Sequence, residues 1–421
     1  MTCLQLRKAY AIAFLLSIIL ICEASADWWQ FQGPDRNGIS PETGLSRSWP
    51  ESGPKELWSF PLGEGFAGPA VRDGEVYILD RQEDKRDILR CLDLATGKER
   101  WNYAYDAAGT VGYSGSRNPP TVTEKYVYSV GMLGDFLCID RKTHQPVWRK
   151  NILTDFGSKP ASWGVSQSPV LWNDLVIVAP QAKGAFVVAY HRETGELVWQ
   201  SPDFGAVGYV SPVVTALAGV EQAVMVSANG KTAGISLENG SLLWTYDGWH
   251  CKIPIPYPTP LPDDRLFITG GYDAGSAMIQ VKKDGDALKV TELFTTDQCN
   301  SQIHQPILYE GHLYANSNSN SASDGMICMT LDGELKWRTR DIKELPRFER
   351  GNLLLADGMI ISLDGKTGIL HLVEASPEGY KELARAAIFD SNKMWAPMAL
   401  TDGKLLLRDQ GQIKCLDLKN P

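Results

Sequence analysis

Short hydrophobic runs recur along the whole chain, and polar turn residues separate one run from the next. Typical stretches are "GPAVRDGEVYIL", "SPVLWNDLVIV" and "QPILYEGHLYA", in which two runs rich in β-branched and aromatic residues flank a two-residue turn. Runs of this length and composition, bounded by turn signals, predict β-strands. Dipeptides such as Asp73-Gly74 and Asp357-Gly358 suit the positive φ angles of tight hairpin turns. The pattern therefore predicts a chain built from β-hairpins.

A second element follows each hairpin and ends in tryptophan. It reads "CLDLATGKERW" at residues 91–101, with related copies at 138–148, 189–199 and 234–244 and a copy one residue shorter at 328–337. Phe294 takes the place of the tryptophan in one unit. Hairpin and element together predict four antiparallel strands in about 40 to 50 residues, which is the pattern of a β-propeller blade. A small residue such as Cys91 or Cys138 begins the element and leaves room for the indole, so we interpret the element as packing and not as a reactive site.

The hairpins predict eight blades. The eighth unit lacks a fourth strand, and residues 55–60 with Trp58 supply a matching strand from the other end of the chain. Pairing of that strand with the segment around Cys415 would close the ring and tie down both ends. We therefore predict an all-β fold, an eight-bladed propeller over residues 54–421 whose last blade is completed by an N-terminal strand. The blades are expected to open near Pro69, Pro120, Pro169, Pro212, Pro258, Pro306, Leu353 and Pro397.

The first 26 residues carry the signals of an export leader. Arg7 and Lys8 precede an apolar run at 11–21, and the small residues "ASA" follow at 24–26. We expect cleavage before Asp27 and a periplasmic or extracellular protein with no transmembrane segment in the mature chain. Lipidation at Cys22 is the alternative, although the preceding Ile21 is large where lipoprotein processing favours a small residue. Residues 27–53 form an N-terminal extension, and the net charge of −9 with no Lys/Arg-rich run argues against nucleic-acid binding.

The repeated element resembles the tryptophan-docking repeat of the pyrroloquinoline quinone (PQQ) propeller superfamily, roughly A-x-D-x-x-T-G-x-x-x-W. Asp93, Thr96, Gly97 and Trp101 match it, and Cys91 stands at the small first position. The stretch "DWWQFQGPDRNGIS" at 27–40 is similar to a signature, W-x-x-F-x-G-P-x-x-x-G, found ahead of such propellers in exported bacterial proteins. The resemblance implies an eight-bladed propeller over about residues 54–421. It covers both quinone-dependent dehydrogenases and non-catalytic scaffolds of outer-membrane assembly.

The dehydrogenase branch of this superfamily implies features that we do not find here. It uses a vicinal disulfide, a Ca²⁺ site of Glu, Asn and Asp oxygens, and an Asp base, whereas this chain has no adjacent cysteine pair and no recognisable carboxylate–Asn cluster. We expect an exported, non-catalytic module without cofactor, which binds a ligand or serves as a scaffold for an unknown protein partner. A PQQ- and Ca²⁺-dependent oxidoreductase is the alternative.

The segments that precede the first strand of each blade are predicted to line one mouth of the central channel. Cations, amides and aromatic rings that converge there suit a small anionic or sugar-like ligand, whereas the alternative is that these are ordinary solvated loop residues. Cys251 and Cys299 lie at equivalent places in neighbouring blades, so either a disulfide or two free thiols is consistent with the sequence. The candidate ligand-binding residues are Arg117, Asn118, Gln167, Tyr209, Lys252, His304, Arg350 and Trp395.

Overall fold

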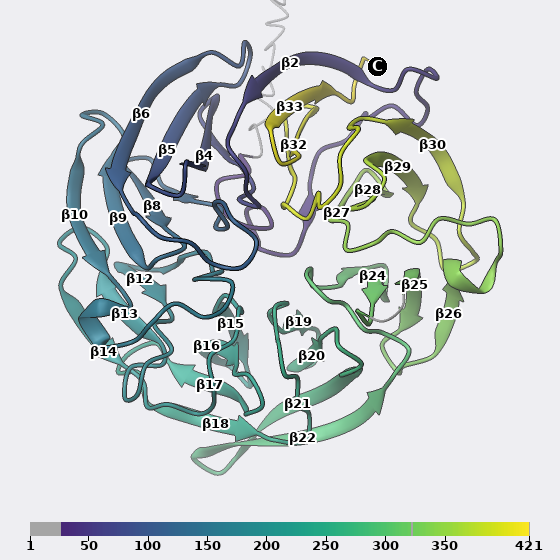
Figure 1. Cartoon of the computed structure of the whole chain (residues 1–421). Coiled ribbons are helices and arrows are strands. Elements are labelled where there is room, and N and C mark those ends of the chain that lie inside the picture. The colour runs from purple at the N-terminus through teal and green to yellow at the C-terminus, as the bar shows by residue number, and fades with distance from the viewer. Residues whose placement is uncertain (1–26, 321–322, 421) are drawn as a thin grey trace, which may run out of the picture.

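Eight sheets stand radially around a central channel, as the repeat predicts (Figure 1). The computed structural model describes residues 27–320 and 323–420. In seven sheets four antiparallel strands follow one another in chain order from the channel to the rim, the eighth takes its outermost strand from the N-terminal part of the chain, and one sheet gains a fifth strand. None of the helices in the described residues is long and apolar enough to cross a membrane.

The first four blades occupy residues 70–246. Blade 1 consists of β3 (Ala70–Arg72), β4 (Glu75–Gln82), β5 (Arg86–Asp93) and β6 (Glu99–Asp106), and blade 2 of β7 (Thr121–Val122), β8 (Tyr126–Val130), β9 (Asp135–Asp140) and β10 (Pro146–Asn151). Blade 3 consists of β11 (Val170–Trp172), β12 (Leu175–Val178), β13 (Val188–His191) and β14 (Leu197–Gln200). Blade 4 consists of β15 (Val213–Leu217), β16 (Val220–Val226), β17 (Thr232–Ser236) and β18 (Leu242–Tyr246).

The remaining blades complete the circle. Blade 5 consists of β19 (Thr259–Leu261), β20 (Arg265–Thr269), β21 (Ser276–Asp284) and β22 (Ala287–Thr296), and blade 6 of β23 (Ile307–Tyr309), β24 (His312–Asn318), β25 (Ser323–Thr330) and β26 (Leu335–Arg338). Blade 7 consists of β27 (Leu353–Ala356), β28 (Met359–Leu363), β29 (Ile369–Glu374) and β30 (Glu382–Ala387), with β1 (Ile39–Ser40) added in parallel to β27. Blade 8 consists of β31 (Ala399–Thr401), β32 (Lys404–Arg408), β33 (Gln412–Asp417) and β2 (Lys55–Pro61). Two single-turn 3₁₀ helices, η1 (Thr154–Phe156) and η2 (Thr339–Asp341), lie in connections.

The ring closes through a strand from the N-terminal part of the chain. Strand β2 pairs antiparallel with β33, and Trp58 stands directly opposite Cys415. The prediction that an N-terminal strand completes the last blade is therefore confirmed. Because sheet hydrogen bonds join the two ends of the ring, opening it would expose two unpaired strand edges.

Aromatic side chains on the outer strands fill the space between neighbouring blades. Trp58 is buried, its Nε1 donates to the Leu94 carbonyl at 2.8 Å, and its ring lies so close to Gly97 in blade 1 that a Cβ there would come within 2.5 Å of it. Gly97 also adopts φ +69°, which favours glycine. Each aromatic residue faces a small or unbranched residue across the strand pair, and the register shifts by one residue just beyond it. The pairs are Cys91–Trp101, Cys138–Trp148, Ala189–Trp199, Gly234–Trp244, Met278–Phe294 and Cys328–Trp337.

The cysteines of the described residues are all buried and unpaired. Four of them, Cys91, Cys138, Cys328 and Cys415, occupy the small position opposite an aromatic ring, as predicted. Of the two alternatives for Cys251 and Cys299, the structure shows free thiols. Burial raises the pKa of both thiols to about 11, so they are protonated and unreactive at neutral pH.

Candidate functional site

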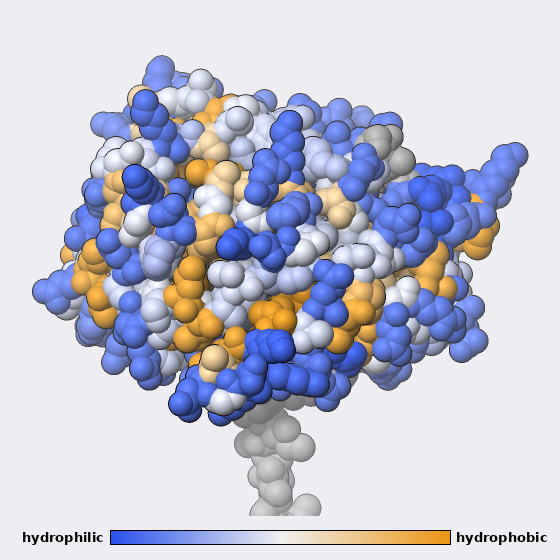
Figure 2. Space-filling model, turned by 90° about the horizontal axis from the view of Figure 1, so that it is seen from below, coloured by the Kyte–Doolittle hydropathy of each residue, from blue (hydrophilic) through white to orange (hydrophobic). Residues whose placement is uncertain are grey.

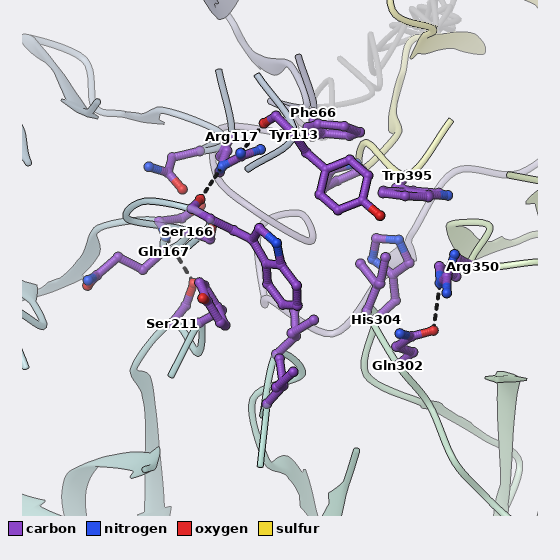
Figure 3. A pocket seen from close by; sticks show the side chains of 18 of the residues that line it. Phe66, Tyr113, Arg117, Ser166, Gln167, Ser211, Gln302, His304, Arg350 and Trp395 are labelled. Carbon is purple, nitrogen blue, oxygen red and sulfur yellow. Dashed lines mark hydrogen bonds between the residues drawn. The ribbon is translucent and has the colours of Figure 1, made fainter. Parts of the chain in front are cut away.

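The central channel holds a cavity of about 400 Å³ at the end where the blades' first strands begin. Each of the eight blades contributes to its wall through the segment that precedes its first strand. The eight connections that lead into the blades therefore converge on one concave place, as the sequence predicted for the channel mouth. Figure 3 shows aromatic, cationic and amide side chains directed toward this space.

Seven of the eight predicted site residues line the cavity. Lys252 does not belong to the lining, and its side chain is exposed to solvent. Ile253 and Ile255, which follow it, and Tyr272 form blade 5's part of the wall instead. The seven lining residues are Arg117, Asn118, Gln167, Tyr209, His304, Arg350 and Trp395.

The N-terminal extension crosses the channel beneath the cavity. The backbone carbonyls of Trp28 and Trp29 accept hydrogen bonds from Val71 in β3 and Val122 in β7, and Gly38 accepts one from Leu355 in β27. These three inner strands belong to blades on different sides of the ring, so the segment between them passes through the channel. Phe31, which lies in this segment, is part of the cavity wall. The extension therefore closes the channel and gives the cavity a floor, and in Figure 1 it runs behind the centre of the ring.

Arg36 anchors this floor from inside the channel. Its guanidinium is buried, donates to the carbonyls of Pro169 and Pro212 at 3.4 Å each, and lies 5.6 Å from the ring centre of Tyr257. The hydroxyl of Tyr257 donates back to the Arg36 carbonyl. In the described part of the chain no carboxylate pairs with this guanidinium, and burial lowers its pKa. Carbonyl dipoles and an aromatic face thus take the place of a counter-ion.

Five aromatic rings form one side of the cavity, and we call them the aromatic arc: Phe66, Tyr113, Trp163, Tyr209 and Trp395. Phe66 and Trp395 are stacked with ring centres 5.3 Å apart, and Tyr113 meets Trp395 edge-on at 5.4 Å. Trp163 and Tyr209 lie 5.0 Å apart. Such contacts rigidify the rings and present a continuous apolar surface to a ligand.

Two arginines flank the arc, and both are already engaged within the protein. The Nε of Arg117 donates to the Trp163 carbonyl, its Nη2 donates to the carbonyls of its own loop, and burial lowers its pKa to about 10. The Nε of Arg350 donates to Gln302 at 2.7 Å, and its Nη1 pairs with Glu349 at 2.6 Å. The charge of Arg350 is therefore balanced by a neighbouring carboxylate, and Arg117 braces the loop that carries Tyr113.

The predicted amides Asn118 and Gln167 also brace the wall. Asn118 Nδ2 donates to the carbonyls of Val130 and Val165 at 2.8 and 3.0 Å. The side chain of Gln167 both donates to and accepts from the backbone of Ala179 at 2.5 Å. Both amides hold their loops in place, which leaves less of their hydrogen-bonding capacity for a ligand than the sequence suggested.

Three bulky residues of the cavity wall have left-handed backbone conformations. Their φ angles are +56° for Tyr113, +61° for Tyr272 and +48° for Arg350. This region costs a residue with a side chain roughly 1–2 kcal/mol relative to ordinary backbone, and glycine is the usual occupant. Strain that gathers at one cavity is a mark of functional sites, because the surrounding fold must support it.

The lining does not fit a calcium-bound quinone. A hard cation such as Ca²⁺ needs several converging oxygen ligands, usually with carboxylates among them. The cavity wall contains no Asp or Glu, and the described residues contain no group of three His, Cys, Asp or Glu that could hold a metal ion. The six cysteines that the structure describes are separate and free, so none of them forms the vicinal disulfide of that branch.

Phe66, Tyr113 and Trp163 lie in the segments that the sequence pointed to but were not among the predicted residues, and three further cavity residues lie outside those segments. Tyr272 and Asn320 lie between the second and third strands of their blades, and Phe31 lies in the N-terminal extension. The repeat marks only the segment before each first strand, and gives no signal for the other connections on the same face of the ring. The signature around Phe31 was visible as a motif, but its place in the channel depends on contacts with distant blades.

Comparison with known proteins supports the repeat family. The model described as outer membrane protein assembly factor BamB matches residues 85–248. A search of curated protein sequences finds no match. The resemblance to the PQQ-like propeller repeat is therefore confirmed by a family model from β5 of blade 1 to the end of blade 4.

Solved structures share the whole fold at low sequence identity. Quinohemoprotein alcohol dehydrogenase ADHIIG from Pseudomonas putida HK5 aligns with a TM-score of 0.66 and 13% identity over 94% of this chain and 81% of its own. BamB from Moraxella catarrhalis aligns with a TM-score of 0.61 and 15% identity over 87% of this chain and 98% of its own. A europium-containing methanol dehydrogenase aligns with a TM-score of 0.63 and 13% identity over 93% of this chain and 89% of its own. At these identities the likeness shows the fold alone.

Proposed function

We propose that this PQQ-like propeller is an exported, non-catalytic protein that binds a small ligand in its channel cavity. The observation that carries the proposal is a cavity of about 400 Å³, walled by all eight blades and closed below by the protein's own N-terminal segment. This size lies within the range of small-molecule sites, roughly 300–1,000 Å³. A ring that served only as a platform would not need a floor or strained aromatic residues around one concave place.

The test is a ligand screen with a variant whose cavity is filled. Ser166 is half-buried in the wall, so Ser166→Trp should occupy the space that a ligand needs. Ser48→Trp, at an exposed position in the N-terminal extension, is the matched control. Thermal-shift screening of residues 27–421 should find compounds that stabilise the parent and the control but not the Ser166→Trp variant. Compounds that stabilise all three equally, or none at all, would contradict the proposal.

The quinone-dependent oxidoreductase remains the alternative function. Two of the similar solved structures are dehydrogenases by name, which supports it, and the chemistry of the lining argues against it. A calorimetric titration of the chain with PQQ and Ca²⁺ separates the two. The proposal expects no calcium-dependent binding, and tight binding that needs Ca²⁺ would establish the alternative.

A scaffold for a protein partner is the second candidate, and the match to an assembly-factor model favours it. Figure 2 shows one edge of the ring, where hydrophobic side chains form short strips between hydrophilic ones. Exposed apolar residues on outer strands, such as Leu197 on β14 and Leu293 on β22, would belong to such a surface. Affinity capture with the parent and with a Leu197→Lys, Leu293→Lys double variant tests this candidate, which predicts a partner retained by the parent alone.

Export is part of the proposal, since the predicted leader at 1–26 lies outside the described residues. The N-terminal sequence of the protein recovered from the producing cell's periplasm or medium should begin at Asp27. A mature chain that begins at Cys22 with an attached lipid would support the lipoprotein alternative instead.

A further inference from the structure

Arg117, which lines the cavity, keeps one terminal nitrogen of its guanidinium free. Its Nε donates to the Trp163 carbonyl, and its Nη2 donates to the carbonyls of Gly112 and Tyr113. Its Nη1 makes no hydrogen bond to any residue that the structure describes, and unlike the unpaired Nη1 of Arg408 it is not shut off from solvent. Both N–H donors of this nitrogen therefore remain available to a ligand.

The positive charge of Arg117 has no counter-ion. No carboxylate in the described part of the chain forms an ion pair with it, and the cavity wall contains no Asp or Glu. Burial lowers the pKa of Arg117 to about 10, so the guanidinium is still charged at neutral pH. Its central carbon lies 5.4 Å from the ring centre of Phe66, a contact that offsets only part of the loss of water around the charge. A partly buried cation of this kind favours an anion beside it.

The other basic side chains of the wall do not add a second free charge. Arg350 pairs with Glu349 at 2.6 Å, and its remaining nitrogens donate to neighbouring amide oxygens. His304 is uncharged at neutral pH, because burial lowers its pKa to about 3, and its Nδ1 lies 3.1 Å from Nδ2 of Asn352. Among the described residues of the wall, Arg117 therefore carries the only unbalanced charge.

The surface beside Arg117 is aromatic. Figure 3 shows Arg117 on the same side of the cavity as Phe66 and Tyr113. Tyr113 is 48% exposed and Trp163 is partly exposed, so both rings still offer surface to a ligand. Because Arg117 donates to the backbone of both residues, a group bound at its Nη1 lies beside the segments that carry these rings. The rest of such a ligand would therefore lie against the aromatic arc.

We infer that the cavity takes a small organic acid, with one carboxylate at Nη1 of Arg117 and a flat ring against the aromatic arc. One carboxylate matches one unbalanced guanidinium, and hydrogen bonds between charged groups are the stronger ones. A phosphate group carries about −1.5 to −2 charges, which exceeds that match. A ligand with several acid groups, PQQ among them, would leave a carboxylate without a partner in an apolar wall. The inference rests on the proposed function and narrows its ligand from the anionic or sugar-like class to ring-bearing monocarboxylates.

The experiment is a calorimetric titration of the mature chain, residues 27–421, with probes that differ in charge or in the ring alone. The probes are cinnamate, its uncharged amide cinnamamide, p-carboxycinnamate with a second acid group, and acetate without a ring. Cinnamate should bind with a dissociation constant of about 1 mM or lower, and about tenfold more tightly than cinnamamide, which lacks the charge. Acetate and p-carboxycinnamate should both bind more weakly than cinnamate. An amide or a second acid group that leaves the affinity unchanged would overturn the inference, as would a failure of cinnamate to bind.

A matched pair of variants identifies the cation. Arg117→Gln removes the charge and should reduce the preference for cinnamate over cinnamamide from about tenfold to less than about threefold. Arg385→Gln makes the same change on the outer strand β30, where the side chain is 65% exposed, and should leave the preference as it is in the parent. A full preference in Arg117→Gln, or an equal loss in both variants, would overturn the role of Arg117. The comparison of probes on the parent needs no variant, so it decides the inference even if Arg117→Gln does not fold.

The variant Ser166→Trp separates this inference from the proposed function. If the wider screen finds compounds that bind the parent but not Ser166→Trp, and cinnamate does not bind more tightly than cinnamamide, the cavity is a ligand site and the assignment to organic acids is wrong. If no compound distinguishes the parent from Ser166→Trp, the proposed function fails together with the inference that rests on it.

Discussion

Replacement of Trp58 by alanine tests how the ring is closed. Trp58 is 8% exposed, its Nε1 donates to the Leu94 carbonyl at 2.8 Å, and its ring covers Gly97 of blade 1. Burial of about 250 Å² at ~25 cal/mol/Å² gives an upper bound of about 6 kcal/mol. Core Trp→Ala substitutions usually cost about 3–5 kcal/mol, and the orphaned Leu94 carbonyl adds to the loss. We expect a decrease of about 4 kcal/mol in the free energy of unfolding.

The assay is equilibrium unfolding in urea followed by far-UV circular dichroism, which does not depend on the tryptophan that is removed. Leu197→Ala, on outer strand β14 with 47% exposure, is the control and should change the free energy by less than about 0.5 kcal/mol. Hydrogen exchange should also accelerate in β2 and β33, because their pairing closes the ring. A loss below about 1 kcal/mol with unchanged exchange in β2 would refute the reasoning that this indole seals the first and last blades together.

Three further predictions concern ionisation, strain and thiol reactivity. Because burial lowers the pKa of His304 from 6.5 to about 3, the unfolded chain binds the proton more tightly, and the free energy of unfolding should fall as pH decreases from 6.5 towards 3. His304→Gln should show a shallower fall in urea titrations at pH 4 to 7, and an identical slope would contradict the assignment. Tyr272→Gly should be more stable than Tyr272→Ala by about 1 kcal/mol in thermal unfolding, because glycine adopts φ +61° without strain; equal stabilities would remove the argument from strain. The folded chain should react with a thiol reagent at fewer than one of its six described cysteines and at all six in denaturant, whereas fast labelling of Cys251 or Cys299 would contradict their burial.

Most of the fold could be predicted because each repeat unit contains the residues that determine its own strands, turns and cross-strand pair. The hairpin dipeptide Asp73-Gly74 has positive φ angles of +51° and +71°, as its turn type requires. The small residue that begins each repeated element faces the aromatic residue that ends it, so the spacing within one element encodes a cross-strand pair. Even the closure through Trp58 followed from one missing strand at the end of the last unit.

The site was less predictable, because it is built by contacts between distant segments. The loops before the first strands were the right place to look, but their sequence does not say which polar groups are already paired. Asn118 and Gln167 brace backbone, and Arg350 is paired with Glu349, so fewer polar groups are available to a ligand than their number suggests. The floor at Phe31 and the orientation of His304 depend on partners in other blades, which a single sequence does not reveal.

The position of a bound ligand tests the central claim most directly. A crystal structure of residues 27–421 with the tightest-binding compound of the screen should show that compound in the channel cavity, above Phe31 and against the aromatic arc. Density for the compound on the outer edge of the ring, with the cavity free of it at saturating concentration, would contradict the account.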